Sequence, residues 1–245
     1  MDTDDRGAGP PVVLLHGQPG DRRDWDAVVA EVGERARVLV PDRPGYGRTG
    51  GPAGGIAANG DAVVSLLDRF GIDRAVLGGH SWGGAVALDV AQRHPERVAS
   101  LVLVASVGAE GSIEDFDRLL GAPVIGPVLA IGGLLALRAP RVRRLVAPND
   151  VVHLLSKSWV FSWRSFVTEQ RALTAELPAI TAALPRTSVP TVVVMGENDR
   201  VVRPRVQEAL ASALPNSSLV RLPGRGHLLP WEAPSDVAAA VVSVL

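Results

Sequence analysis

Short apolar runs alternate along most of this chain with longer stretches in which apolar residues recur every three or four positions. The short runs are rich in Val and Leu, as strands buried on both faces are. They lie at residues 12–15, 38–40, 74–78, 101–104, 191–195 and 219–222. The helical stretches lie at residues 25–35, 60–70, 82–94, 205–214 and 235–245. This alternation predicts an α/β fold, with a mostly parallel central sheet of about six strands and helices on both faces.

The alternation stops between residues 106 and 188. No strand-like run occurs there, and prolines at 123, 127, 140, 148, 178 and 185 divide the segment into several helical pieces. A segment of this length with its own helices is too long for a simple loop. We therefore predict a core made of residues 1–106 and 188–245, with a helical insertion at residues 107–187.

The most informative motif is GHSWGG at residues 79–84, which stands between a predicted strand and a predicted helix. A serine on such a corner is pushed out above the sheet by the strained turn, where a base can reach its hydroxyl. Small residues on either side are needed because larger side chains would collide. A glycine-rich turn that contains a serine by chance is the alternative, but the flanking elements favour Ser81 as a nucleophile.

A nucleophilic serine needs a base to remove its proton and an acid to orient that base. Asp199 follows the predicted strand 191–195, and His227 follows the predicted strand 219–222. Both therefore belong to the carboxyl ends of strands, where open α/β sheets bind their ligands. We predict that these two residues serve Ser81 as acid and base. The remaining histidines fit the role of base less well: His16, His80, His94 and His153.

Acyl transfer also needs hydrogen-bond donors for the developing oxyanion. One donor would be the backbone N–H of Trp82, directly after the candidate nucleophile. The second would be the backbone N–H of Gln18, in the loop HGQPG at residues 16–20 that follows the first predicted strand. A plain Gly-Pro turn is the alternative for this loop.

Five motifs, in this order, resemble those of the α/β-hydrolase superfamily and in particular its small capped serine hydrolases: HGQPG at 16–20, DRPGYGR at 42–48, GHSWGG at 79–84, GEND at 196–199 and GH at 226–227. The resemblance implies the fold of that family and a triad of Ser81, Asp199 and His227, in the family's chain order. It also implies that the insertion at 107–187 is a cap over the active site. The family's sheet opens with an antiparallel hairpin. Because only eleven residues precede residue 12, we expect that N-terminal hairpin to be absent or shortened.

The aromatic residues of the predicted cap allow two interpretations. They either anchor the cap to the core or line an apolar pocket beside Ser81, and the apolar run at 124–137 leaves the same two possibilities. In both cases we expect a largely apolar cavity. The aromatic residues concerned are Trp159, Phe161, Trp163 and Phe166.

The function implied by the resemblance is hydrolysis of a small or medium, largely apolar carboxylic ester through an acyl-enzyme. Cofactor-free haloperoxidases (perhydrolases) and carbon–carbon hydrolases share the triad, although the latter usually carry Trp after the histidine, where this chain has Leu228. Haloalkane dehalogenases and epoxide hydrolases use a carboxylate nucleophile, which argues against them. A small-molecule receptor without turnover is an alternative of another class.

Composition narrows the possible partners further. The chain has 245 residues and a net charge of −1, without a basic patch, which argues against nucleic acid. The absence of Cys excludes disulfides and thiol chemistry. The first residues, MDTDD, are acidic and have no apolar core, so we predict no signal peptide, a cytoplasmic location and no membrane partner. The expected mechanism needs neither a metal nor an organic cofactor.

Overall fold

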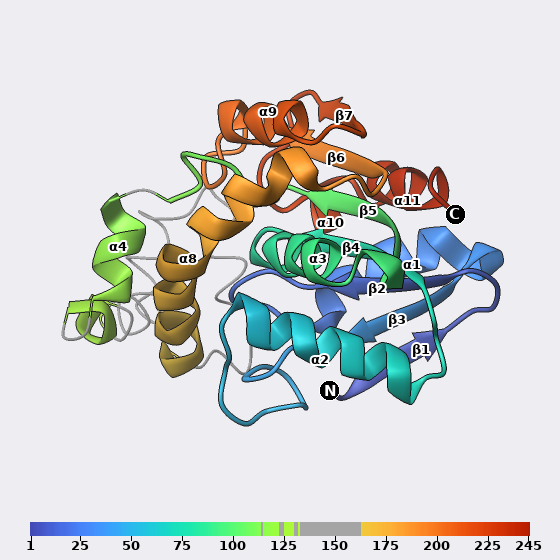
Figure 1. Cartoon of the computed structure of the whole chain (residues 1–245), viewed down its shortest axis with the longest axis horizontal. Coiled ribbons are helices and arrows are strands. Elements are labelled where there is room, and N and C mark those ends of the chain that lie inside the picture. Colours follow the sequence, from blue (N-terminus) through green and yellow to red (C-terminus); the bar gives the residue numbers. More distant parts are fainter. Residues whose placement is uncertain (114, 123–124, 130–131, 133–162) are drawn as a thin grey trace.

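A twisted sheet of seven strands forms the centre of the computed structural model, which describes residues 1–113, 115–122, 125–129, 132 and 163–245 (Figure 1). The strand order is β1-β3-β2-β4-β5-β6-β7. All neighbours pair in parallel except β1 and β3, which are antiparallel. The strands are β1 (Thr3–Arg6), β2 (Pro11–Leu15), β3 (Arg37–Pro41), β4 (Ala75–His80), β5 (Val98–Val104), β6 (Thr191–Gly196) and β7 (Ser217–Leu222).

Helices cover both faces of the sheet, as the alternation predicts. Successive strand residues point to opposite faces, so Val13 and Leu15 join one apolar core while Val12 and Leu14 join the other. Helices α2 (Ile56–Arg69), α3 (Trp82–Arg93), α8 (Trp163–Ala183) and α9 (Pro204–Ala213) pack into the first core. Helices α1 (Asp26–Val32), α10 (Leu229–Glu232) and α11 (Pro234–Val242) pack into the second. Four short 3₁₀ turns are also described: η1 (Arg22–Trp25), η2 (Gly33–Arg35), η3 (Pro95–Arg97) and η4 (Leu184–Arg186).

The predicted number of strands is wrong by one. Besides the six expected strands, the sheet contains β1, which pairs antiparallel with β3 from Thr3↔Pro41 to Arg6↔Val38. An apolar pattern cannot find this strand because its sequence, TDDR, is polar throughout. Asp5 pairs with Arg37 at 2.7 Å, so ion pairs take the place of apolar packing at this edge. Charged edge strands also discourage pairing with other chains.

Helices α4 (Asp115–Gly121) and α8 lie in the segment predicted to form a cap. Helix α4 packs against α8, and the two stand beyond one end of the sheet (Figure 1). The second half of α8 buries Leu173, Leu177 and Ile180 in the same apolar core as the buried residues of α3. Trp159, Phe161 and most of the run 124–137 lie outside the described residues. The division into core and cap stays a prediction. None of the described helices combines the length and the apolar character needed to cross a membrane.

Candidate functional site

Ser81 occupies a strained corner between β4 and α3. Its φ of 51° and ψ of −118° place it in a backbone region that residues with a side chain rarely adopt. Its N–H donates to Val104 O on the neighbouring strand at 2.9 Å, which fixes the corner to the sheet. A Cβ on Gly79 would collide with the backbone of Gly83, and a Cβ on Gly83 would collide with Leu15 O. The flanking glycines are therefore required by close backbone contacts on both sides of the serine.

Asp199 and His227 are brought together by the loops after β6 and β7. His227 Nδ1 lies 2.9 Å from Asp199 Oδ2, and both side chains are almost fully buried. The other carboxylate oxygen, Oδ1, accepts the backbone N–H groups of Val201 and Val202 at 2.8 and 2.9 Å. Because the carboxylate can only accept, the neutral ring of His227 donates from Nδ1. Its Nε2 is then left as a base.

His80 connects the corner at Ser81 to His227. Its Nε2 donates to His227 O at 2.9 Å, and the two rings lie 5.0 Å apart between centroids. Burial, together with the charge of His227, lowers the pKa of His80 to about 3. His80 is therefore neutral and packs beneath the corner, as its place on the opposite strand face predicts. The residue next to Ser81 thus holds the backbone of the candidate base.

The loop after β2 lies against the serine. A Cβ on Gly17 would stand 3.3 Å from Ser81 Cβ and 2.9 Å from His80 Nδ1, so only glycine lets the loop approach this closely. The next residue, Gln18, donates its side-chain Nε2 to Phe166 O on α8 at 2.7 Å. The structure therefore brings Gly17 and Gln18, Ser81 with Trp82, and the Asp199–His227 pair to one edge of the sheet. Their roles as oxyanion hole and triad remain proposals.

Behind this loop lies a buried polar cluster that no sequence pattern revealed. The Arg43 guanidinium pairs with the Glu169 carboxylate on α8, and the hydroxyl of Tyr46 donates to Glu169 Oε2 at 2.6 Å. Burial raises the pKa of Glu169, while the charge of Arg43 opposes that shift. Burial likewise raises the pKa of Tyr46 well above its ordinary value. The motif at 42–48 predicts a shaped turn, and Gly45 and Gly47 do take positive φ angles of 87° and 49°.

Gln207 is a second residue that could not be found from the sequence. It is fully buried on α9, and its Nε2 donates to Asp199 Oδ2 at 3.1 Å and to Val202 O at 2.9 Å. No motif marks this position, because an amide eight residues after the acid is an ordinary helix residue in sequence. Only the turn of α9 back onto the loop brings it to the carboxylate.

A surface hollow of about 530 Å³ borders the loop that carries Asp199. The residues that line it are Asp199, Arg200, Arg203, Pro204 and Arg205. These arginines would suit an anionic group, in contrast to the apolar cavity expected from the sequence. Within the described ranges, no three His, Asp or Glu side chains gather in the way that a metal ion requires.

Comparison with known proteins identifies the family. The model of the alpha/beta hydrolase family matches residues 12–240, and the chain belongs to this family. A solved structure of a thermophilic esterase from Thermogutta terrifontis is similar over 99% of this chain and 91% of its own, with a TM-score of 0.80 and 30% identity.

Two curated relatives show how varied the family is. A dihydrolipoyllysine-residue acetyltransferase component of an acetoin cleaving system from Pseudomonas putida is 28% identical over 97% of this chain, which spans 64% of that protein. A 2-hydroxymuconate semialdehyde hydrolase from Pseudomonas sp. (strain CF600) is 40% identical over 48% of this chain and 44% of its own. Membership supports a hydrolase enzyme and leaves its substrate open.

Proposed function

We propose that this chain is a serine hydrolase that cleaves a small or medium, largely apolar carboxylic ester through an acyl-enzyme on Ser81. The observation that carries the proposal is the strained serine at the end of β4, at the same end of the sheet as the 2.9 Å contact between His227 Nδ1 and Asp199 Oδ2. A serine hydroxyl alone is a weak nucleophile, and a base oriented by a buried carboxylate activates it. The similarity to an esterase agrees with this chemistry.

The proposed steps give each residue of the site one task. Nε2 of His227 takes the proton of Ser81 as its oxygen attacks the ester carbonyl, while Asp199 stabilises the imidazolium that forms. The N–H groups of Gln18 and Trp82 hold the oxyanion. The alcohol leaves with the proton from His227, and water then attacks the acyl-enzyme by the same route. His227 must be neutral to accept the proton of Ser81.

The test is a pre-steady-state experiment with p-nitrophenyl esters from acetate to decanoate. We expect a burst of nitrophenol stoichiometric with enzyme, and covalent labelling of Ser81 by a serine-directed phosphonate. Ser81→Ala should lose both, whereas Ser106→Ala, which removes a hydroxyl bonded to Val107 O, should keep both. Labelling that persists in Ser81→Ala would show that another residue is the nucleophile.

The same ester series tests the substrate class. An apolar pocket gains up to about 0.8 kcal/mol for each methylene buried, so kcat/KM should climb with chain length and then fall once the pocket is full. Trp163 is the aromatic residue of the predicted cap to replace first, because it begins α8 and is half-buried. Preference for a hemisuccinate ester over the uncharged series would contradict the apolar pocket and point to the arginine-lined hollow.

Two other candidates can be separated in the same assays. The match to a 2-hydroxymuconate semialdehyde hydrolase favours carbon–carbon bond hydrolysis as the second candidate. Turnover of that compound without turnover of esters would establish it. A perhydrolase would oxidise halide with peroxide and a carboxylic acid present. Tight binding of a small molecule with no burst and no product would instead favour a receptor.

A further inference from the structure

We propose that Arg43 is a positioning residue for the oxyanion-binding peptide between Gly17 and Gln18, and that Glu169 of α8 holds Arg43 in place. The inference rests on the proposed function of Ser81, since an oxyanion hole has meaning only for acyl chemistry. It assigns a task to a buried ion pair that the proposed mechanism does not otherwise use.

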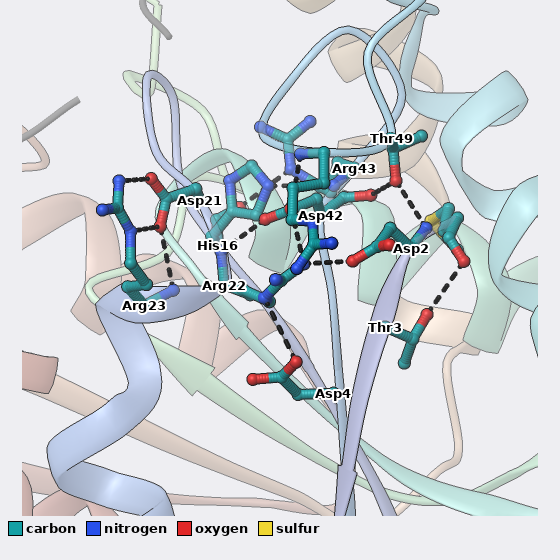
Figure 2. Close-up of polar contacts among 12 residues, drawn as sticks. Asp2, Thr3, Asp4, His16, Asp21, Arg22, Arg23, Asp42, Arg43 and Thr49 are labelled. Carbon is teal, nitrogen blue, oxygen red and sulfur yellow. Dashed lines mark hydrogen bonds and ion pairs between the residues drawn. The ribbon is translucent and has the colours of Figure 1, made fainter. Parts of the chain in front are cut away.

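Arg43 donates hydrogen bonds to two successive carbonyl groups of the loop after β2. Its Nε donates to His16 O and its Nη2 donates to Gly17 O, both at 2.9 Å. The backbone N–H of Arg43 also donates to His16 Nε2 at 3.0 Å, a contact drawn in Figure 2. That bond makes Nε2 the acceptor, so the neutral ring carries its proton on Nδ1 and donates it to Gly17 O at 2.9 Å. Burial and the charge of Arg43 lower the pKa of His16, which keeps the ring neutral.

These contacts fix the direction of the Gln18 N–H. In a planar trans peptide the C=O and the N–H point in opposite directions. Because Gly17 O faces Arg43 and His16, the N–H of the same peptide points away from the guanidinium. Gly17 itself packs on Ser81, so this N–H belongs to the part of the loop nearest the serine. Hydrogen bonds to the carbonyl also polarise the peptide and strengthen its N–H as a donor.

The guanidinium contacts the second candidate donor as well. It lies 4.4 Å from the centroid of the Trp82 ring, and a cation over an indole face is attracted to it. Trp82 is 1% exposed, so its ring is fixed between Arg43 and the core. One side chain therefore supports both residues whose N–H groups would form the oxyanion hole.

Glu169 provides the counter-charge that allows the Arg43 guanidinium to be buried beside the loop after β2. The side chains of Arg43 and Glu169 are 1% and 0% exposed, and an unpaired buried charge is strongly destabilising. Tyr46 and Arg43 both donate to the carboxylate, so its oxygens are well satisfied. Ser165, one turn earlier in α8, donates to Gly45 O at 2.9 Å. The first turns of α8 are thus bonded to the loops after β2 and β3.

The test compares an oxoester with its thionoester, in which sulfur replaces the carbonyl oxygen and accepts hydrogen bonds poorly. The oxo-to-thiono ratio of kcat reports the oxyanion donors and does not change with a general loss of stability. Arg43→Lys keeps the charge beside Glu169 but cannot reach both carbonyls. We expect its ratio to fall by roughly tenfold or more, with KM nearly unchanged, against the ~10²- to 10³-fold that loss of a whole donor costs.

Arg22→Lys is the matched control. In the wild type, the guanidinium of Arg22 pairs with Asp42, the residue before Arg43, at 2.9 Å. It also pairs with Asp2 and Asp4 (Figure 2). We expect this variant to keep the wild-type ratio. If Arg43→Lys does not fold, Arg43→Met combined with Glu169→Gln removes both charges, while the amide introduced by the second substitution can still bond to Tyr46.

The outcomes separate this inference from the proposed function. A folded Arg43→Lys or double variant with the wild-type oxo-to-thiono ratio would overturn the positioning role alone, since Ser81 would still be acylated. Absence of an acyl-enzyme in the wild type would overturn the proposed function and this inference together. A ratio that falls in Arg43→Lys and in Arg22→Lys alike would also contradict the inference, because the effect would not be specific to Arg43.

Discussion

At the scale of single residues, the carboxylate of Asp199 is held on all sides. Val201 and Val202 donate to one oxygen, while Gln207 and His227 share the other. Gln207 Nε2 contacts two acceptors, which settles the orientation of its amide. Its Oε1 is buried without a partner among the described residues. An unsatisfied carbonyl costs free energy, so the donation by Nε2 has to compensate for it.

Gln207→Met should lower stability. The substitution removes the hydrogen bond from Nε2 to Asp199 Oδ2, and a hydrogen bond to a charged group contributes about 1.5–3 kcal/mol. Because it also removes the buried Oε1, which lacks a partner in the described part of the chain, we expect the free energy of unfolding to fall by about 1–2 kcal/mol, measured by urea titration. Gln92→Met is the control and should cost less, since Gln92 donates to Ile180 O in the core. Unchanged stability in Gln207→Met would show that the amide only fills space.

The sequence predicts the candidate triad because each member directly follows an apolar strand in a motif with a known order. The structure brings Asp199 and His227 into contact, and it places Ser81 at the same end of the sheet. Gln207 and Glu169 could not be predicted, because each reaches the site only through the packing of its helix and no motif marks either position. Arg43 lies in the motif at residues 42–48, which is visible in the sequence, but its partner Glu169 is 126 residues away.

At the scale of elements, α3 packs so closely on the end of β2 that no side chain fits between them at Gly83. A Cβ on Gly83, in the first turn of α3, would collide with the carbonyl oxygens of Leu15 and His16. These are backbone atoms and cannot turn aside. Gly78 on β4 is different, since its added Cβ would meet only the flexible end of Leu14.

Gly83→Ala should therefore be costly and Gly78→Ala mild. Alanine at 83 must push α3 away from the loop after β2, which we expect to lower the free energy of unfolding by about 1–3 kcal/mol. Because His16 belongs to that loop, kcat should also fall. Urea unfolding and ester turnover of the two variants provide the measurement. Equal stability in both would mean that α3 can shift freely.

The predictability of the elements follows their apolar content. Strands β2 to β6 are predicted because burial on both faces demands continuous apolar runs. Strand β7 is only partly buried and is predicted from the short run at residues 219–222. Strand β1 is missed because its charged residues contribute ion pairs instead of core contacts. Helix α2 begins at Ile56, four residues before the predicted start. The prediction places the start too late because Asn59 and Gly60, although buried, are polar or small and interrupt the apolar pattern.

At the scale of the whole molecule, two buried neutral histidines make stability depend on pH. His16 and His80 have lowered pKa values in the folded state, His80 to about 3, whereas the unfolded chain protonates them near 6.5. Below pH 6.5 the unfolded state binds more protons, so stability is full above that value and falls as the pH drops toward 3. Each histidine contributes a slope of about 1.4 kcal/mol per pH unit. The raised pKa of Glu169 acts in the opposite sense.

His80→Asn should reduce this acid sensitivity. We expect the loss of unfolding free energy between about pH 6 and pH 5 to be smaller than in the wild type by about 1 kcal/mol, because one titrating group is gone. His94→Asn serves as the control, since His94 is a partly exposed residue at the end of α3. Urea titrations at the two pH values give the comparison. Identical slopes in wild type and His80→Asn would show that His80 is already protonated when folded.

The ion pair of Arg43 and Glu169 also limits how the family can exchange its parts. Arg43 belongs to the turn after β3, while Glu169 belongs to α8, within the predicted insertion. Each of these two segments therefore takes its counter-charge from the other. A chimera that received residues 107–187 from a relative without an acid at position 169 would enclose a lone arginine. Arg43 and Glu169 must therefore be inherited together, and the predicted insertion is not an interchangeable module.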